Sequence, residues 1–205
     1  MNSALFRIKQ MLLGWGGVGL IYNTADRWQG VGQVLQPGPI DRLIPFDPAG
    51  VWLYLSFFLL IPAAYFSCPE KRLIWLRSAF QLAALTAGAV FLAWPTTLSY
   101  PADPGGTLSS TLLATLSQID SVQNCFPSLH MALTVLAIWA LHDTERPAKN
   151  ALFWLWGLGI AFSIIQLRRH LFIDLIAGTG LGLTIGWLCR RFLSFSTRLQ
   201  EGAPS

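Results

Sequence analysis

Two short stretches of the sequence combine a histidine with groups that can support its chemistry. Residues 166–174 read Gln-Leu-Arg-Arg-His-Leu-Phe-Ile-Asp, and residues 124–130 read Asn-Cys-Phe-Pro-Ser-Leu-His. His170 and Asp174 are four positions apart, so on a helix they share one face. A carboxylate inside an apolar segment is costly and usually has a specific partner. We therefore expect Asp174 to pair with His170, and the question is whether His130 can reach them.

A pair of histidines with a carboxylate suits phosphoryl transfer. One imidazole attacks phosphorus, the carboxylate holds it in the nucleophilic tautomer, and the other imidazole protonates the leaving oxygen. The phosphate oxygens need positive charge nearby, from arginine or from helix N-termini. Arg169 and Arg168 are the first candidates because they flank His170, followed by Arg27 and Arg42.

Each of these residues also has a simpler interpretation. His130 alone would be a helix-end histidine satisfied by backbone or water. Asp174 could serve simply as a cap for the helix that it begins, since an acid near an N-terminus interacts favourably with the helix dipole. Arg168 and Arg169 could bind lipid headgroups. The chemical interpretation depends on the two stretches meeting.

The composition determines which elements must position these residues. Of the 205 residues, 53% are hydrophobic and only 12% are charged, which excludes an ordinary soluble domain. The net charge of +4 is spread near the ends of apolar runs, so we expect no nucleic-acid partner. The sequence predicts one all-α, polytopic membrane domain over residues 1–205.

Six apolar runs are long enough, or nearly so, to span a bilayer as helices. They cover about 4–22, 50–67, 73–94, 127–142, 150–166 and 171–189. With the N-terminus inside, ten Lys and Arg residues fall on the inner side and four on the outer side, as the positive-inside rule requires. This topology puts both termini in the cytoplasm and both histidine stretches at the extracytoplasmic face. We expect a retained first segment, a flexible tail at 194–205, and a bacterial inner membrane.

Three further patterns concern packing. Gly178, Gly182 and Gly186 recur every four residues, which predicts close helix packing. Residues 107–118 predict a short amphipathic helix between two membrane segments. Cys125 lies on the outer side while Cys68 and Cys189 lie on the inner side, so no disulfide framework is expected.

The two histidine stretches resemble a known family. Pro127-Ser128-Leu129-His130 is similar to the Pro-Ser-Gly/Leu-His motif, and His170-x-x-x-Asp174 to the final motif, of the type 2 phosphatidic acid phosphatase superfamily. The context of His170, together with residues 44–48, Trp52 and Tyr54, is closest to the branch containing inositol phosphorylceramide synthases. The resemblance covers about residues 40–180.

The resemblance implies a role for each motif residue. His170 would be the nucleophile that forms a phosphohistidine, Asp174 its orienting partner and His130 the general acid. Ser128 and the backbone near it would bind phosphate at a helix N-terminus.

The sequence also departs from the family pattern. A Lys and an Arg-Pro expected before the Pro-Ser motif are missing, because residues 95–126 contain no Lys or Arg. Ser163 matches the serine of the family's third motif. In the family an arginine follows that serine, whereas this sequence has Ile164. We expect Arg168 and Arg169 to replace these cations.

Several functions fit these residues. Water attacking the phosphohistidine makes a lipid phosphatase, whereas a hydroxyl acceptor makes a headgroup transferase. A zinc site at His130, His170 and Asp174, with Cys125, is compatible with the spacing, but nothing demands a metal and the arginines oppose a cation. A non-enzymatic transporter predicts charges at mid-depth in the spans, where this sequence has almost none. The expected partners are a lipid phosphate substrate and the membrane, with no metal and no cofactor.

Overall fold

The computed structural model describes residues 3–103 and 105–201, without the side chains of 194–201. Most of the chain is helical, as the sequence predicts. Four helical stretches are long and apolar enough to cross a membrane: Pro48–Ser67, Glu70–Ala93, Pro147–Gln166 and Phe172–Leu193. The protein is therefore an integral membrane protein. The flexible tail expected at 194–205 falls outside the fully described residues.

The elements follow one another in a simple order. They are α1 (Ser3–Met11), a π-helical turn (Leu12–Gly16), α2 (Gly17–Trp28), β1 (Gln33–Leu35), α3 (Pro39–Leu43), a 3-10 turn (Pro48–Gly50), α4 (Val51–Leu55), α5 (Phe57–Ser67), a 3-10 turn (Glu70–Arg72), α6 (Leu73–Ala93), β2 (Thr96–Leu98), α7 (Leu108–Ile119), α8 (Leu129–Leu141), α9 (Pro147–Gln166) and α10 (Phe172–Glu201). The first expected segment forms α1, the π-helical turn and α2. The fourth forms α8, an apolar helix of 13 residues.

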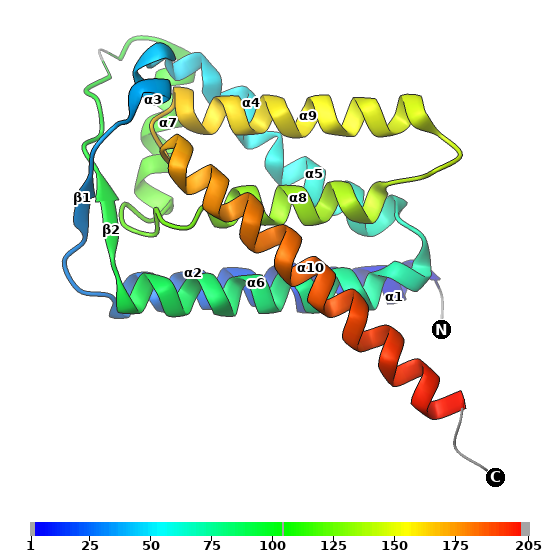
Figure 1. The fold of residues 1–205 in the computed structure, drawn as a ribbon. Helices are drawn as coiled ribbons and strands as arrows, with labels where there is room; N and C mark the ends of the chain where they lie inside the picture. The colour runs from blue at the N-terminus through cyan, green and yellow to red at the C-terminus, as the bar shows by residue number, and fades with distance from the viewer. Residues whose placement is uncertain (1–2, 104, 202–205) are drawn as a thin grey trace.

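The long helices lie side by side, and α10 crosses them obliquely (Figure 1). One end of the bundle carries α3, α7 and the small sheet in which β1 pairs with β2 in parallel. The opposite end carries α1 and the connection from α8 to α9. The helix expected at 107–118 is present as α7, and the Thr107 hydroxyl caps it by accepting from the Ser110 N–H.

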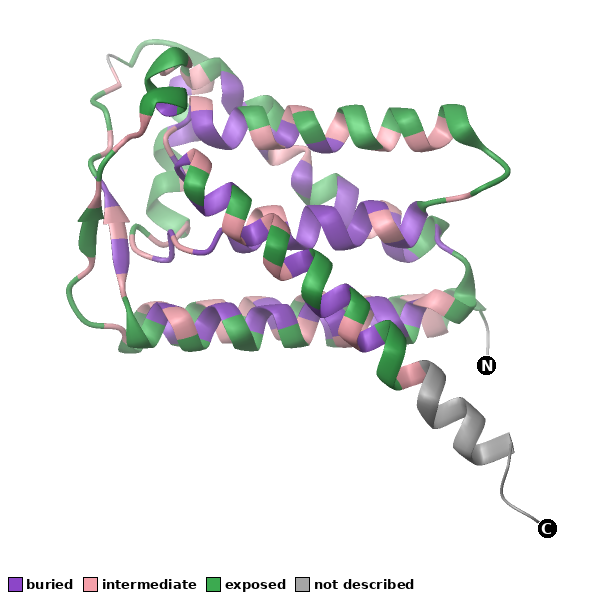
Figure 2. Cartoon of the chain, in the orientation of Figure 1, coloured by how far each residue is buried: buried purple, intermediate pink, exposed green. Residues whose placement is uncertain are grey.

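Helix α8 is the centre of the bundle. Almost every residue from Leu129 to Leu141 is buried, whereas α9 exposes large apolar side chains such as Leu155 and Leu158 (Figure 2). A helix that is apolar on all sides belongs in a core or in a membrane. The exposed apolar surface of α9 therefore suits contact with lipid.

Glycines allow α10 to approach α8 closely. A Cβ atom on Gly178 would lie 2.2 Å from the Ser128 carbonyl oxygen, and one on Gly182 would lie 2.7 Å from the Ala132 carbonyl oxygen. Both distances are far below normal contact, so only glycine fits. The close packing predicted from the glycine repeat is confirmed, and it presses the start of α10 against the start of α8.

Arginines close the end of the bundle that carries α1. Arg7 Nη1 donates to the carbonyl oxygens of Tyr65 and Cys68, at 2.8 and 3.0 Å, where α5 ends. Arg72 Nη1 donates to the Ala140 carbonyl oxygen at 2.9 Å, where α8 ends. These bonds satisfy carbonyls that a helix C-terminus leaves without a partner.

Candidate active site

The two histidine motifs meet where α8 and α10 begin. His130 lies in the first turn of α8, and His170 lies two residues before α10. Their ring centroids are 5.9 Å apart. The Ser128 N–H donates to the Asp174 carbonyl oxygen at 3.0 Å, which joins the two motifs through their backbones. Side chains from two distant parts of the sequence thus face one small volume.

His170 is held in one tautomer by a backbone carbonyl. Its Nδ1 lies 2.7 Å from the Cys125 carbonyl oxygen, which can only accept, so Nδ1 carries the proton and Nε2 keeps its lone pair. Burial, with a smaller contribution from the charge of His130, lowers the pKa of His170 to about 3. The imidazole is therefore neutral at physiological pH, which is the form that a nucleophile requires.

Asp174 supports His170 from a greater distance than the sequence predicts. Its Oδ2 is 3.8 Å from His170 Nδ1 and accepts instead from the Leu171 N–H at 2.8 Å. The carboxylate is fully buried, and its Oδ1 has no hydrogen-bond partner among the described residues. Asp174 thus caps the start of α10 and lies beside the ring, while the Cys125 carbonyl oxygen makes the direct bond to His170.

His130 contacts an aromatic residue and, through it, a carboxylate. Its Nε2 is 3.0 Å from the Tyr54 hydroxyl, which is itself 3.1 Å from Asp120 Oδ2. The ring of Phe57 packs edge-on against the imidazole, with centroids 4.9 Å apart. Tyr54 comes from α4 and Asp120 from the end of α7, so two further elements position His130.

A buried ion pair lies beside the histidines. Arg169 Nη2 is 2.9 Å from Asp120 Oδ2, and the two side chains are 3% and 13% exposed. Arg169 Nη1 donates to the Ser117 hydroxyl at 3.2 Å, and the guanidinium lies over the ring of Tyr100. Its Nε has no hydrogen-bond partner among the described residues. Of the four candidate arginines, Arg169 is the one that the structure brings into the cluster.

Asp120 is ionised at neutral pH. Burial by itself raises the pKa of this carboxyl, but the neighbouring charges of His130 and Arg169, together with hydrogen bonds, outweigh burial and lower the pKa below its ordinary value. One of those bonds comes from the Tyr22 hydroxyl, at 2.8 Å from Oδ1. No sequence motif identifies Asp120, because the loop before the Pro-Ser motif is distinguished in the sequence only by its lack of Lys and Arg.

The other three arginines lie elsewhere. Arg168 has a left-handed backbone, with φ of 55°, and its guanidinium donates to the carbonyl oxygens of Asp41 and Ile44 at 2.6 and 2.7 Å. Arg27 and Arg42 are exposed, and neither contacts the histidines or Asp120 among the described residues. Arg168 therefore ties the loop after α9 to the segment around α3.

Ser128 lies at the N-cap of α8. Its hydroxyl accepts from the Met131 N–H at 3.3 Å, and the residue is fully buried. Ser128 therefore caps the start of α8 beside His130, and the N-terminus of a helix is a position that favours anions.

The family model of the PAP2 superfamily matches residues 91–198, which is more than half of the chain. This chain belongs to the PAP2 superfamily. No curated protein and no solved structure matched it. Members of the PAP2 superfamily are generally phosphatases, so the match supports an enzyme that acts on phosphate esters at a membrane.

The PAP2 region contains both histidines, Asp120 and Arg169, but not all of their partners. Tyr22 and Tyr54 lie before residue 91. So does Asp41, a buried residue whose Oδ1 accepts from the Phe172 N–H at 2.7 Å and whose Oδ2 accepts from the Gly38 N–H at 2.8 Å. Asp41 thus caps α10 from a segment 131 positions earlier. No sequence motif identified this contact.

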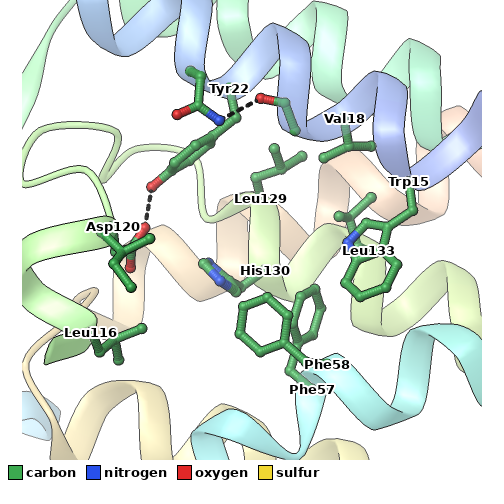
Figure 3. Close-up of a pocket in the computed structure, with 13 residues that line it drawn as sticks. Trp15, Val18, Tyr22, Phe57, Phe58, Leu116, Asp120, Leu129, His130 and Leu133 are labelled. Carbon is green, nitrogen blue, oxygen red and sulfur yellow. Dashed lines mark hydrogen bonds between the residues drawn. The ribbon is translucent and has the colours of Figure 1, made fainter. Parts of the chain in front are cut away.

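A cavity of about 210 Å³ extends from His130 into the apolar part of this PAP2 protein (Figure 3). Asp120, Tyr22 and His130 line its polar end, and Trp15 and Leu133 lie at the other end (Figure 3). Most of its remaining lining is apolar and comes from α2, α5, α7 and α8. The cavity can therefore receive an apolar chain whose polar group lies beside His130.

A metal site was one of the alternatives that the sequence left open. Across residues 3–103 and 105–193, no group of three or more His, Cys, Asp or Glu side chains is placed to hold a metal ion. Cys125 is buried, and burial raises the pKa of its thiol to about 12. The Cys125 side chain is therefore a protonated, packed thiol. The residue contributes to the site through its backbone carbonyl oxygen, which binds His170 Nδ1.

Proposed function

We propose that this PAP2 protein is a membrane lipid phosphatase or phosphotransferase that works through a phosphohistidine at His170. The observation that carries the proposal is the neutral His170, whose Nε2 lone pair is free and which lies beside His130 with ring centroids 5.9 Å apart. The substrate would be a lipid phosphate, pyrophosphate or phosphodiester, with its apolar chain in the cavity lined by Trp15 and Leu133.

In the first step His170 Nε2 attacks phosphorus. The bond from phosphorus to the leaving oxygen breaks with its electron pair on that oxygen, and His130 supplies the proton. Negative charge on the other phosphate oxygens would be stabilised by Arg169 and by the N–H groups at the start of α8 near Ser128. Asp120 and Ser117 hold the Arg169 guanidinium in place before the substrate arrives, and its Nε has no hydrogen-bond partner among the described residues.

In the second step an oxygen nucleophile attacks the phosphohistidine, and His130 accepts its proton as the bond from phosphorus to nitrogen breaks. With water the products are those of a phosphatase. With a lipid or sugar hydroxyl the protein is a headgroup transferase, similar to inositol phosphorylceramide synthases. Both reactions use the same residues.

For the topology we propose six membrane crossings, with the first made by α1 and α2 and the fourth by α8. The active site would be extracytoplasmic and both termini cytoplasmic, in a bacterial inner membrane. Arg7 and Arg72 support this orientation, since they bond at the end of the bundle opposite to α3 and α7.

Labelling tests the intermediate. The purified protein in detergent is mixed with a lipid phosphate carrying radioactive phosphorus and quenched in alkali, which preserves phosphohistidine. We expect label on the wild type and on His142→Ala, a control histidine at the far end of α8, but none on His170→Ala. Equal labelling or turnover in His170→Ala would refute the proposal. Adding hydroxyl acceptors to the same assay separates transferase from phosphatase.

A further inference from the structure

Resting on the proposed function, we propose that Asp120, acting through Tyr54, is a positioning residue that holds His130 as the proton donor to the leaving oxygen. The family motifs assign a carboxylate to His170 and none to His130. The structure gives His130 a carboxylate as well, from a loop that carries no motif and through a tyrosine from α4.

The direction of each bond follows from what each atom can do. Asp120 is ionised, so Oδ2 can only accept, and the Tyr54 hydroxyl at 3.1 Å must donate to it. A hydroxyl has a single hydrogen, so the Tyr54 oxygen presents a lone pair to His130 Nε2 at 3.0 Å. His130 Nε2 must therefore carry a proton and donate it to Tyr54.

This arrangement leaves the other ring nitrogen for catalysis. No described residue forms a hydrogen bond with His130 Nδ1. In the protonated ring, Nε2–H stays bonded to Tyr54 while Nδ1–H is transferred to the leaving oxygen. The imidazole becomes neutral, and the leaving oxygen becomes a hydroxyl group. No proton has to pass through Tyr54.

Asp120 also balances the charges around His130. Within the part of the chain that the structure describes, the ionisable groups that interact with the imidazole are Tyr54, His170, Asp120 and Arg169. The positive Arg169 disfavours a second positive charge on His130. Asp120 opposes this effect because its carboxylate lies 2.9 Å from Arg169 and is connected to the His130 ring through the Tyr54 hydroxyl. Without Asp120, the protonated imidazole would face an uncompensated guanidinium.

The dependence of the rate on the leaving group distinguishes a positioning role of Asp120 from a merely structural role. An alkoxide needs a proton as it departs, whereas a nitrophenolate departs without one. We therefore compare two phosphate esters that carry the same lipid-like chain. The leaving group is an alkoxide in the alkyl ester and a nitrophenolate in the nitrophenyl ester. The quantity measured is the single-turnover rate of leaving-group release, which reports the first step alone.

In Asp120→Asn we expect leaving-group release from the alkyl ester to be roughly 100-fold or more slower than in the wild type, since general acid catalysis contributes about 10²–10⁴-fold. The fold-reduction for the nitrophenyl ester should be smaller than that for the alkyl ester by a factor of roughly ten. Tyr54→Phe, which keeps the ring, should give the same pattern. In both variants the loss of rate at high pH should begin at a lower pH than in the wild type, because the acid loses its proton more easily.

Tyr22→Phe is the matched control. It removes the other tyrosine hydroxyl bound to Asp120, on Oδ1, and leaves the bond to Tyr54 in place. Its effect should be the same for both esters. Equal slowing of both esters by Asp120→Asn and Tyr54→Phe would overturn the inference while the labelled phosphohistidine still supports the proposed function. Absence of label on the wild type with either ester would overturn the proposed function, and this inference with it.

Discussion

Gly178 sets the separation of the two histidine motifs, and its replacement tests that idea directly. An alanine Cβ at this position would lie 2.2 Å from the Ser128 carbonyl oxygen and 3.2 Å from the Met131 Cβ. Normal contact requires more than 3 Å, so the start of α10 must move away from α8 by about 1 Å. Helix α10 carries Asp174, and His170 directly precedes it.

The cost has two parts. Overpacking a close helix contact typically costs about 1–3 kcal/mol, and the gain in helix propensity from glycine to alanine returns at most about 1 kcal/mol. A net loss of roughly 1–2 kcal/mol of unfolding free energy follows. A displacement of about 1 Å at reacting groups can lower the rate about 100-fold. Gly178→Ala should therefore damage activity far more than stability.

Gly180→Ala is the control, because no atom lies within 4 Å of a Cβ at that position in the same helix. Unfolding is followed in mixed detergent micelles, and kcat is measured on the same preparations with a lipid phosphate. We expect Gly180→Ala to resemble the wild type in both. Similar activity in Gly178→Ala and Gly180→Ala would refute the argument that this contact positions the histidines.

Two further predictions concern buried polar groups near α10. His170 has a pKa of about 3 when folded and an ordinary value of 6.5, so the unfolded chain binds a proton that the folded chain excludes. The unfolding free energy should therefore fall as pH drops from about 6.5 toward 3, by up to about 1.4 kcal/mol per pH unit, and thermal unfolding in detergent should show a weaker slope for His170→Gln. Asp41→Ala leaves two backbone N–H groups without their acceptor and should cost about 1–3 kcal/mol for each buried group, whereas Asp47→Ala, which removes an exposed cap, should cost less in the same unfolding assay.

The parts of the fold that the sequence predicts are those with a local cause. Long apolar runs form the membrane helices, and the glycine repeat forms the contact of α10 with α8. The motif spacing places His130 in the first turn of α8 and Asp174 in the first turn of α10. Hydropathy and spacing within one helix carry this information.

The contacts that the sequence does not predict join distant segments or depend on a rare backbone conformation. Tyr54 meets Asp120 across 66 positions, and Asp41 meets Phe172 across 131. No periodicity connects such pairs. The two adjacent arginines look alike in sequence, yet the left-handed φ of 55° at Arg168 turns its side chain to α3 while Arg169 enters the site. A non-glycine residue in that conformation leaves no compositional signal.

The cap that Asp41 places on α10 comes from outside the region that matches the PAP2 family model. The region that defines the family, residues 91–198, carries both histidines, but a polypeptide of that region alone would lack the acceptor for the Phe172 N–H, the carbonyls that hold Arg168 and the hydroxyl that binds His130. The site is thus assembled by the whole chain. The segments that carry Asp41, Ile44 and Tyr54 therefore belong to the framework of the candidate active site and are more than an anchor that could be exchanged for another membrane segment.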